Sequence, residues 1–262
     1  MSRFLMGFNS EFLKFCFSRT TKIVVMLTVF LQSGLAYIAS KQILSVGLNA
    51  TPEKNSSLYE AIPSIEYLGF DVIIFGLLPM IVLGAVYGAG EFKSHSMRTT
   101  LLSNNSKTIC FLTKLSFITI ASLVISLVSI IITISVTHLS LGNVGLKPLV
   151  LKPIVWKFIV LGTISWSGLT VLAFVIAFLF RTAVVPLLFL IPQVYNVGAF
   201  LSERFEIARL LPVSIGNSLI ASSDKALTQN PLTSILILLI WIIFLGFLAF
   251  VRFYKSDLGG EY

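Results

Sequence analysis

The chain of 262 residues is 56% hydrophobic and only 11% charged, and its formal net charge is +8. A soluble domain typically carries about 25% charged residues. This composition excludes an ordinary soluble domain, because the chain has too few charged and polar side chains to cover a surface exposed to water. The apolar stretches are long enough for membrane-spanning helices and too long for barrel strands. We therefore predict an all-α integral membrane protein with a single transmembrane domain, 1–262.

The first 22 residues predict a helix that lies in the membrane interface without crossing it. Charged side chains interrupt this segment at Glu11, Lys14 and Arg19, so it does not match a cleavable signal peptide and we expect it to be retained. Its apolar side chains recur every three or four residues, as on one face of a helix, at Phe4, Leu5, Phe8, Phe12, Phe15 and Cys16.

Six apolar segments are long enough to cross the roughly 30 Å hydrocarbon core of a bilayer. They are predicted at 23–40, 67–89, 115–137, 154–180, 183–201 and 232–250. The fifth contains Pro186 and Pro192, each of which removes a backbone donor, so we expect this span to be broken. Residues 202–230 mix charged and apolar side chains and predict one or two short external helices, at the membrane surface or dipping partway into it.

The distribution of charge predicts that both termini lie in the cytoplasm. In that orientation the inner segments carry eleven Lys and Arg against four Asp and Glu, whereas the outer segments carry eight against seven. This asymmetry follows the positive-inside rule. We interpret the net positive charge as a topology signal and as attraction to anionic membrane lipid. It does not indicate a nucleic-acid partner, because no basic face interleaved with aromatic residues stands in a soluble domain.

The polar segment 91–107, between the second and third spans, carries the most specific pattern in the chain. The spacing of Phe92 and Met97 from Leu101 and Leu102 predicts a short amphipathic helix on the cytoplasmic side. An Asn-Asn-Ser turn follows it. An ordinary charged cytoplasmic loop is the alternative, because hydropathy alone would place a polar loop here.

The same segment resembles the cytoplasmic coupling helix of type 2 ABC exporter permeases. In that family a small-residue run leads to Glu, an Arg-Thr-x-Leu-Leu pattern, a turn ending in a basic residue, and a further Lys. The matching residues here are Glu91, Arg98, Thr99, Leu101, Leu102, Lys107 and Lys114. Where the family often has Gly before the Thr and Pro before the turn, this chain has Met97-Arg98 and Asn104-Asn105. The resemblance extends to the whole architecture, including the broken fifth span and the Leu-Leu-Pro-Val segment before the sixth.

The resemblance implies a transport subunit that is not itself an enzyme. The chain has no P-loop, so ATP and Mg would be bound by a separate ABC ATPase and no cofactor by this chain. Two ATPase copies would work with a homodimer or a heterodimer of permeases in the bacterial cell membrane. The substrate implied is an antimicrobial or other amphipathic peptide, or a similar hydrophobic molecule, moved out of the cell or membrane.

The resemblance also assigns roles to the residues that would contact the ATPase. Glu91 and Arg98 would position the coupling helix by charge. Leu101 and Leu102 would insert into a groove of the ATPase. Arg181, in the tight turn after the fourth span, would lie close to the same partner.

Asp71, Trp166 and Tyr195 are the candidates for a substrate path. Asp71 lies near the outer end of the second span, and intramembrane carboxylates are costly and often functional. A solvated interfacial carboxylate is the alternative, and Trp166 and Tyr195 could equally be aromatic residues that anchor helices at the interface. His95 and His138 fall on opposite sides of the membrane, so we predict no metal site.

Two other functional classes stay open. A secondary transporter or channel not coupled to ATP would carry intramembrane charged pairs or inverted repeats. An intramembrane enzyme would carry paired carboxylates, a histidine cluster or a Ser–Lys pair at one depth. Neither pattern is clear in the sequence.

Overall fold

The computed structural model describes residues 3–53, 61–92, 97, 100–101, 106–147, 150–220 and 230–256, and regular structure within these ranges is helical throughout. Five of these helices are long and apolar enough to cross a membrane. They are α2 (Arg19–Val46), α3 (Ile73–Gly90), α5 (Lys107–Ser140), α6 (Pro153–Phe180) and α10 (Pro231–Lys255). The chain is therefore an all-helical, multi-pass membrane protein.

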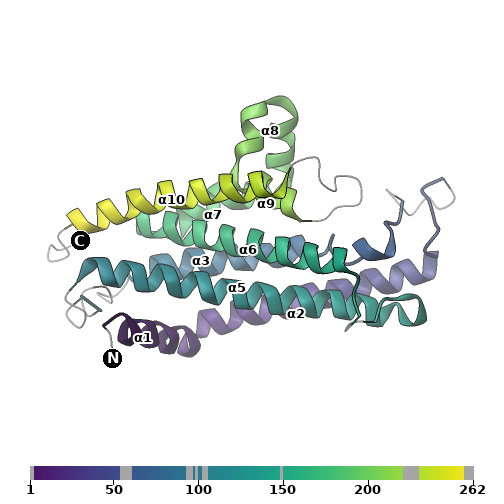
Figure 1. Ribbon diagram of the computed structural model, residues 1–262, viewed down its shortest axis with the longest axis horizontal. Helices are drawn as coiled ribbons and strands as arrows, with labels where there is room; N and C mark the ends of the chain where they lie inside the picture. Colours follow the sequence, from purple (N-terminus) through teal and green to yellow (C-terminus); the bar gives the residue numbers. More distant parts are fainter. Residues whose placement is uncertain are drawn as a thin grey trace.

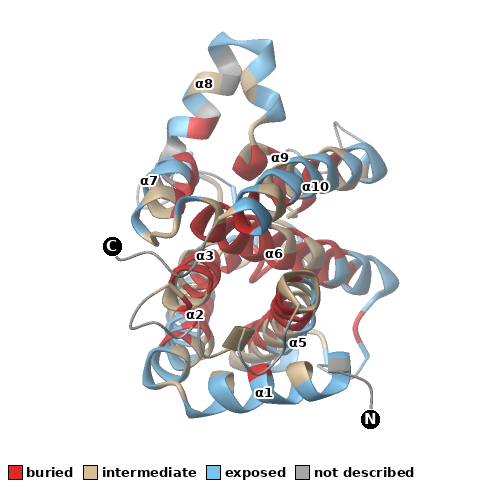
Figure 2. Cartoon of the chain, turned by 90° about the vertical axis from the view of Figure 1, so that its left-hand side faces the viewer, coloured by how far each residue is buried: buried red, intermediate tan, exposed pale blue. Residues whose placement is uncertain are grey.

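The long helices form an elongated bundle, and both chain termini lie at the same end, called the terminal end below (Figure 1). The most deeply buried helix is α6, which packs against α3, α5 and α10. Its side chains are buried over most of its length, as Figure 2 shows looking along the bundle. On the other side, α2 packs against α3 and α5.

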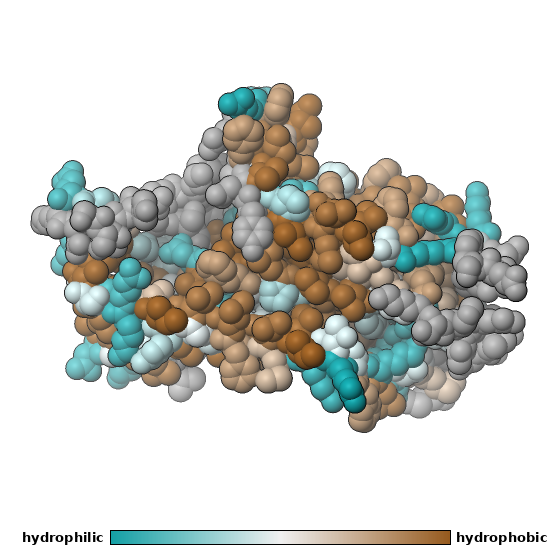
Figure 3. Space-filling view, turned by 180° about the vertical axis from the view of Figure 1, so that it is seen from behind, coloured by the Kyte–Doolittle hydropathy of each residue, from teal (hydrophilic) through white to brown (hydrophobic). Residues whose placement is uncertain are grey.

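The outside of the bundle is apolar where lipid would contact it. Large side chains of α2 and α10 point outward, among them Phe30, Ile243 and Phe247. Apolar side chains also cover much of the middle of one face, whereas hydrophilic ones lie mainly toward its ends (Figure 3). Such a surface is unfavourable in water but matches the hydrocarbon core of a bilayer.

Glycines in α3 allow close packing of its backbone against α6. A Cβ atom on Gly84 would lie 2.1 Å from the backbone oxygen of Thr170, and one on Gly88 would lie 2.6 Å from that of Phe174. Both neighbours belong to α6. The small-residue run of the second span therefore brings the backbones of α3 and α6 into contact, as small residues do in membrane helices.

The N-terminal segment forms a separate helix, α1 (Arg3–Phe17), which lies obliquely across the terminal end (Figure 2). Ser18 divides it from α2, because its backbone is extended and its side-chain oxygen accepts a hydrogen bond from the Thr21 amide. This is the geometry of a helix N-cap. The spanning helix thus begins at Arg19, four residues before the start predicted for the first span.

Other boundaries differ from the prediction for local reasons. The second spanning helix begins at Ile73 and not at 67, since Gly69 adopts a positive φ of 92° in a turn that a side chain would strain. Short 3-10 turns flank the long helices at η1 (Ile65–Tyr67) and η2 (Gly142–Val144). The helices α2 and α5 extend beyond the predicted spans because their polar ends continue the helix outside the apolar stretch.

The segment predicted as the fifth span is not one continuous helix. It consists of α7 (Val184–Pro192), a π-helical stretch η3 (Gln193–Val197) and α8 (Gly198–Arg204). The chain then continues through η4 (Glu206–Leu210) and α9 (Pro212–Leu219). The α-helical pattern changes at Pro192, where a break was expected, but it continues through Pro186, which lies in the first turn of α7, where a missing backbone donor is tolerated. Because α8 turns away from the bundle (Figure 1), five uninterrupted spanning helices replace the six predicted among the described residues.

The two helices that flank α8 and η4 in the chain pack against the bundle. The helix α7 lies against α3 and α6, and α9 lies against α6 and α10. Ser165 of α6 donates a hydrogen bond to the backbone oxygen of Gly216 in α9, at 2.8 Å. Part of the predicted external region, 202–230, is thus buried between long helices.

Candidate functional site at the terminal end of the bundle

Five side chains from three elements form a buried ionic cluster at the terminal end. Glu11 and Lys14 come from α1, Tyr87 from the last turn of α3, Glu91 from the residue that follows α3, and Lys114 from α5, about two turns after its start. We call these five residues the ionic cluster. It lies where the polar segment 91–107 leaves one spanning helix and enters the next.

Lys114 is the centre of the cluster. Its side chain is fully buried, and its Nζ atom lies 2.7 Å from Oε1 of Glu11 and 2.7 Å from Oε1 of Glu91. The two carboxylates therefore share one ammonium group. Glu11 belongs to α1, Glu91 follows α3, and Lys114 belongs to α5. This single lysine therefore links three elements.

Lys14 and Tyr87 complete the cluster. The Nζ atom of Lys14 lies 3.2 Å from Glu11 Oε1 and 3.4 Å from Glu91 Oε1, and it donates a hydrogen bond to Thr100 Oγ1 at 3.1 Å. The Tyr87 hydroxyl donates to Glu11 Oε2 at 2.5 Å. Through Thr100, the cluster reaches into the polar segment 91–107.

The charges in the cluster balance, which explains how they can be buried. Two carboxylates face two ammonium groups, and a buried ion pair is tolerated only when each charge is compensated and hydrogen-bonded. Burial alone would raise the pKa of Glu11, but Lys114, Tyr87 and Lys14 together bring that pKa below its usual value. For Lys14, burial alone would lower the pKa, and the carboxylates of Glu11 and Glu91 raise it above its usual value.

Three further basic residues hold the neighbouring helix ends at the terminal end. Arg181, in a left-handed conformation after α6, places its guanidinium 5.3 Å from the ring centre of Phe92. Lys107 donates hydrogen bonds to the backbone oxygens of Tyr254 and Ser256, at 3.0 and 2.8 Å. Arg252 donates to the backbone oxygen of Leu179 at 2.8 Å.

The structure gathers several of the predicted coupling residues at the terminal end. Glu91 lies in the ionic cluster, Arg181 lies against Phe92, and Lys107 contacts the end of α10. Leu101 is half-buried and packs against an apolar cluster that includes Phe178. The remaining predicted coupling residues, Arg98, Thr99 and Leu102, lie outside the described part of the chain.

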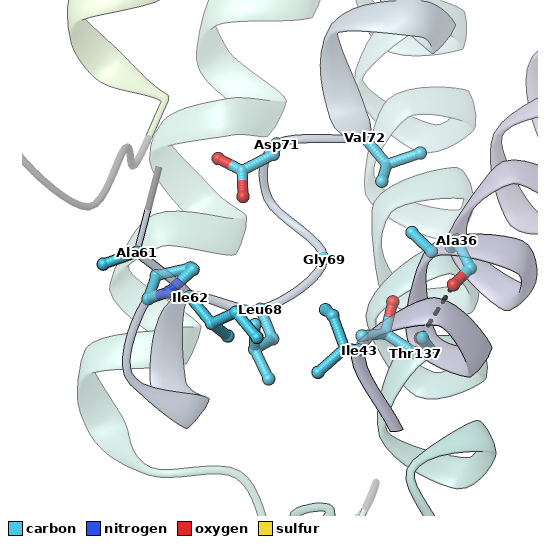
Figure 4. Close-up of a pocket in the computed structure, with 12 residues that line it drawn as sticks. Ala36, Ile43, Ala61, Ile62, Leu68, Gly69, Asp71, Val72 and Thr137 are labelled. Atoms are coloured by element: carbon cyan, nitrogen blue, oxygen red, sulfur yellow. Dashed lines mark hydrogen bonds between the residues drawn. The ribbon is translucent and has the colours of Figure 1, made fainter. Parts of the chain in front are cut away.

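The three substrate-path candidates are not brought together. Asp71 lies at the edge of a cavity of about 240 Å³ at the end opposite the termini, between α2, α5 and the loop before α3 (Figure 4). Trp166 is fully buried in the middle of α6, against Gly76 of α3. The backbone of Tyr195 lies in the π-helical stretch, and its side chain is outside the described residues.

Sequence reasoning identified Glu91 but not Glu11, the second carboxylate that pairs with Lys114, which was expected among the charged residues of an interfacial helix. In the structure, Glu11 is only 3% exposed. The available signal was Lys114, a cation about two turns into a long apolar helix, because such a charge requires a buried counter-charge. Comparisons of the chain with protein-family models, curated proteins and solved structures give no match.

Proposed function

We propose that this chain is the membrane-spanning permease subunit of an ATP-driven ABC exporter. The observation that supports the proposal is the ionic cluster, which connects Thr100 of the polar segment to α1, α3 and α5. A permease that does not hydrolyse ATP needs a cytoplasmic element that an ATPase can move, and that element must be attached rigidly to the spanning helices. The ionic cluster supplies such an attachment.

In the proposed mechanism, two ATPase subunits bind ATP and Mg, close on each other and displace segment 91–107. The cluster would transmit this displacement to α1, α3 and α5 as one unit. The backbone contact between Gly84 and Thr170 would carry it further, to α6. A displacement of packed helices of this kind is a common form of conformational switching.

The proposed topology follows from the same arrangement. The helices α7 and α9 would together make a discontinuous fifth crossing, so that six crossings place both termini on the cytoplasmic side of a bacterial membrane. The permease would work as a dimer, with itself or with a similar chain. An amphipathic or antimicrobial peptide, or a similar hydrophobic molecule, is the proposed substrate.

The test compares Glu91→Gln with a matched substitution at the other end of the bundle. Glu66 pairs with Lys152 beyond the spanning region, so Glu66→Gln also removes one carboxylate from one ion pair. In proteoliposomes containing permease and ATPase, Glu91→Gln should lower permease-dependent ATP hydrolysis about tenfold or more, as expected for loss of coupling between two sites. Glu66→Gln should leave it unchanged.

Equal hydrolysis by Glu91→Gln and the unsubstituted complex would contradict the coupling role. Transport that continues in vesicles holding this chain alone, driven by an ion gradient, would instead support a secondary transporter. Both outcomes can be read from the same preparations.

A further inference from the structure

Residues 198–210, comprising α8 and η4, leave the bundle at about the middle of its length. We call these residues the protruding segment. Figure 1 shows it standing nearly perpendicular to the long helices, and Figure 2 shows it outside the circle of packed helices. Its base lies beside α9 and contacts α10.

A hydrogen bond fixes the depth of this segment. Trp241 of α10 donates through Nε1 to the backbone oxygen of Leu210, with a distance of 2.9 Å. Trp241 stands midway between Asn230, which caps the start of α10, and Arg252 in its last turn. At 1.5 Å per residue, it is about 16 Å from either, which is about half the thickness of the hydrocarbon core. The base of the protruding segment therefore lies near the middle of the membrane.

The protruding segment carries charges that lipid cannot solvate at this depth. Arg204, Glu206 and Arg209 are exposed, and hydrophilic side chains are visible at the tip in Figure 3. Neither Glu206 nor Arg209 forms an ion pair with another described side chain. Charged residues inside a membrane almost always face protein or a water-filled cavity, because a charge in hydrocarbon costs several kcal/mol or more.

Large apolar side chains lie beside these charges. Phe205 is 60% exposed and Ile207 is 82% exposed. Water would leave these two side chains unfavourably solvated, and lipid would do the same for the charges. A mixed surface of this kind is satisfied best when another protein covers it.

We propose that the protruding segment is the contact surface for a second copy of this chain. Its four charged residues are two acids and two bases, Glu203, Arg204, Glu206 and Arg209, so the segment has no net charge. In a two-fold symmetric dimer the same surface meets itself, and a surface that carries both signs can then pair acids with bases. This inference requires the membrane position of the bundle but not its coupling to ATP.

The first test uses cysteine cross-linking in native membranes. With Cys16 and Cys110 replaced by serine, a single cysteine is introduced at Phe205 or Ile207, and a bifunctional maleimide or an oxidant is added. Cross-linked dimers are expected on non-reducing gels. Ile243→Cys is the matched control, because Ile243 is exposed on α10 near the same depth, and it should give no dimer.

The second test inverts the charges. Glu206→Arg or Arg209→Glu alone should lower the cross-linking yield about tenfold, since like charges would then face each other across the contact. The double substitution restores one acid and one base and should recover the yield. Should a single charge variant fail to fold, the result at Ile207→Cys in the otherwise unchanged segment decides the matter.

Four results would overturn the proposal, three of them from the cross-linking and labelling of the single-cysteine variants. These three are the absence of cross-linking at both Phe205→Cys and Ile207→Cys, a yield at Ile243→Cys equal to theirs, and rapid labelling of Ile207→Cys by a membrane-impermeant maleimide in intact cells. The last would place the protruding segment in water. Cross-linking to a different protein, without a dimer of this chain, would also contradict the second copy as the partner.

Discussion

Lys114 is the residue whose loss should affect the terminal end most. It is fully buried, and both carboxylates of the ionic cluster depend on its ammonium group at 2.7 Å. Removal of one partner from a buried ion pair leaves an uncompensated charge, which typically costs about 3–5 kcal/mol. We therefore expect Lys114→Met to lower the thermal unfolding temperature in detergent clearly. Lys107→Met, which removes two hydrogen bonds to backbone oxygens, one exposed and one partly buried, but no buried ion pair, should lower it much less.

A double substitution separates the charge from the packing. Loss of Lys114 leaves two carboxylates facing the single ammonium group of Lys14. Adding Glu11→Gln to Lys114→Met removes the excess negative charge, so the double variant should be more stable than the sum of the single effects predicts. Such non-additivity is the mark of residues that interact directly. Strictly additive losses would show that Glu11 and Lys114 stabilise the bundle independently.

Glu11 predicts a specific dependence of stability on pH. Its pKa is below the usual value of 4.5 in the folded chain, so its contribution to stability is complete above that value. The contribution is lost as pH falls through the folded-state pKa. The difference in unfolding temperature between the unsubstituted chain and Glu11→Gln should therefore be largest near neutral pH and shrink in acid. A difference that is constant from neutral pH down to pH 3 would contradict this.

At the scale of elements, the contact between α3 and α6 depends on the absence of a side chain at Gly84. Because a Cβ atom there would lie 2.1 Å from a backbone oxygen of α6, Gly84→Ala must push the two helices apart. Overpacking of this kind costs about 1–3 kcal/mol. Gly90→Ala, in the same helix but with no atom within 4 Å of the added Cβ, should cause no loss. Thermal unfolding of both variants in detergent tests the difference, and equal stability would disprove the close contact.

The elements that could be predicted from the sequence are those that hydropathy alone defines. The long apolar helices α2, α3, α5, α6 and α10 correspond to five of the predicted spans. The path after Pro192 could not be predicted in detail, because a proline announces a break but not the direction of the chain after it. Whether 212–219 packs inside the bundle depends on the tertiary contact of Gly216 with Ser165.

The candidate site was only partly predictable for a similar reason. Glu91 was identified from its place in the polar segment, and Lys114 as part of the same pattern. Glu11 lies 103 residues from Lys114, and nothing in local periodicity indicates that one face of α1 turns toward α5. Pairing between distant elements requires the packed structure.

At the scale of the whole molecule, α1, which carries part of the ionic cluster, lies at the same end as both termini (Figure 1). The loop before α3, which carries Asp71 and lines the cavity, lies at the other end. In the proposed transport cycle the first end would receive the force generated by ATP, and the opposite end would release the substrate. The central claim is therefore that the terminal end binds a separate ATPase.

Co-purification tests that claim most directly. This chain, carrying the only affinity tag, is co-expressed with an ABC ATPase from the same genome, and both subunits in the eluate are quantified together with ATP hydrolysis. We predict equal amounts of the two subunits, and hydrolysis that disappears when the P-loop lysine of the ATPase is replaced. A permease that elutes intact but alone, with no ATP hydrolysis, would contradict the account.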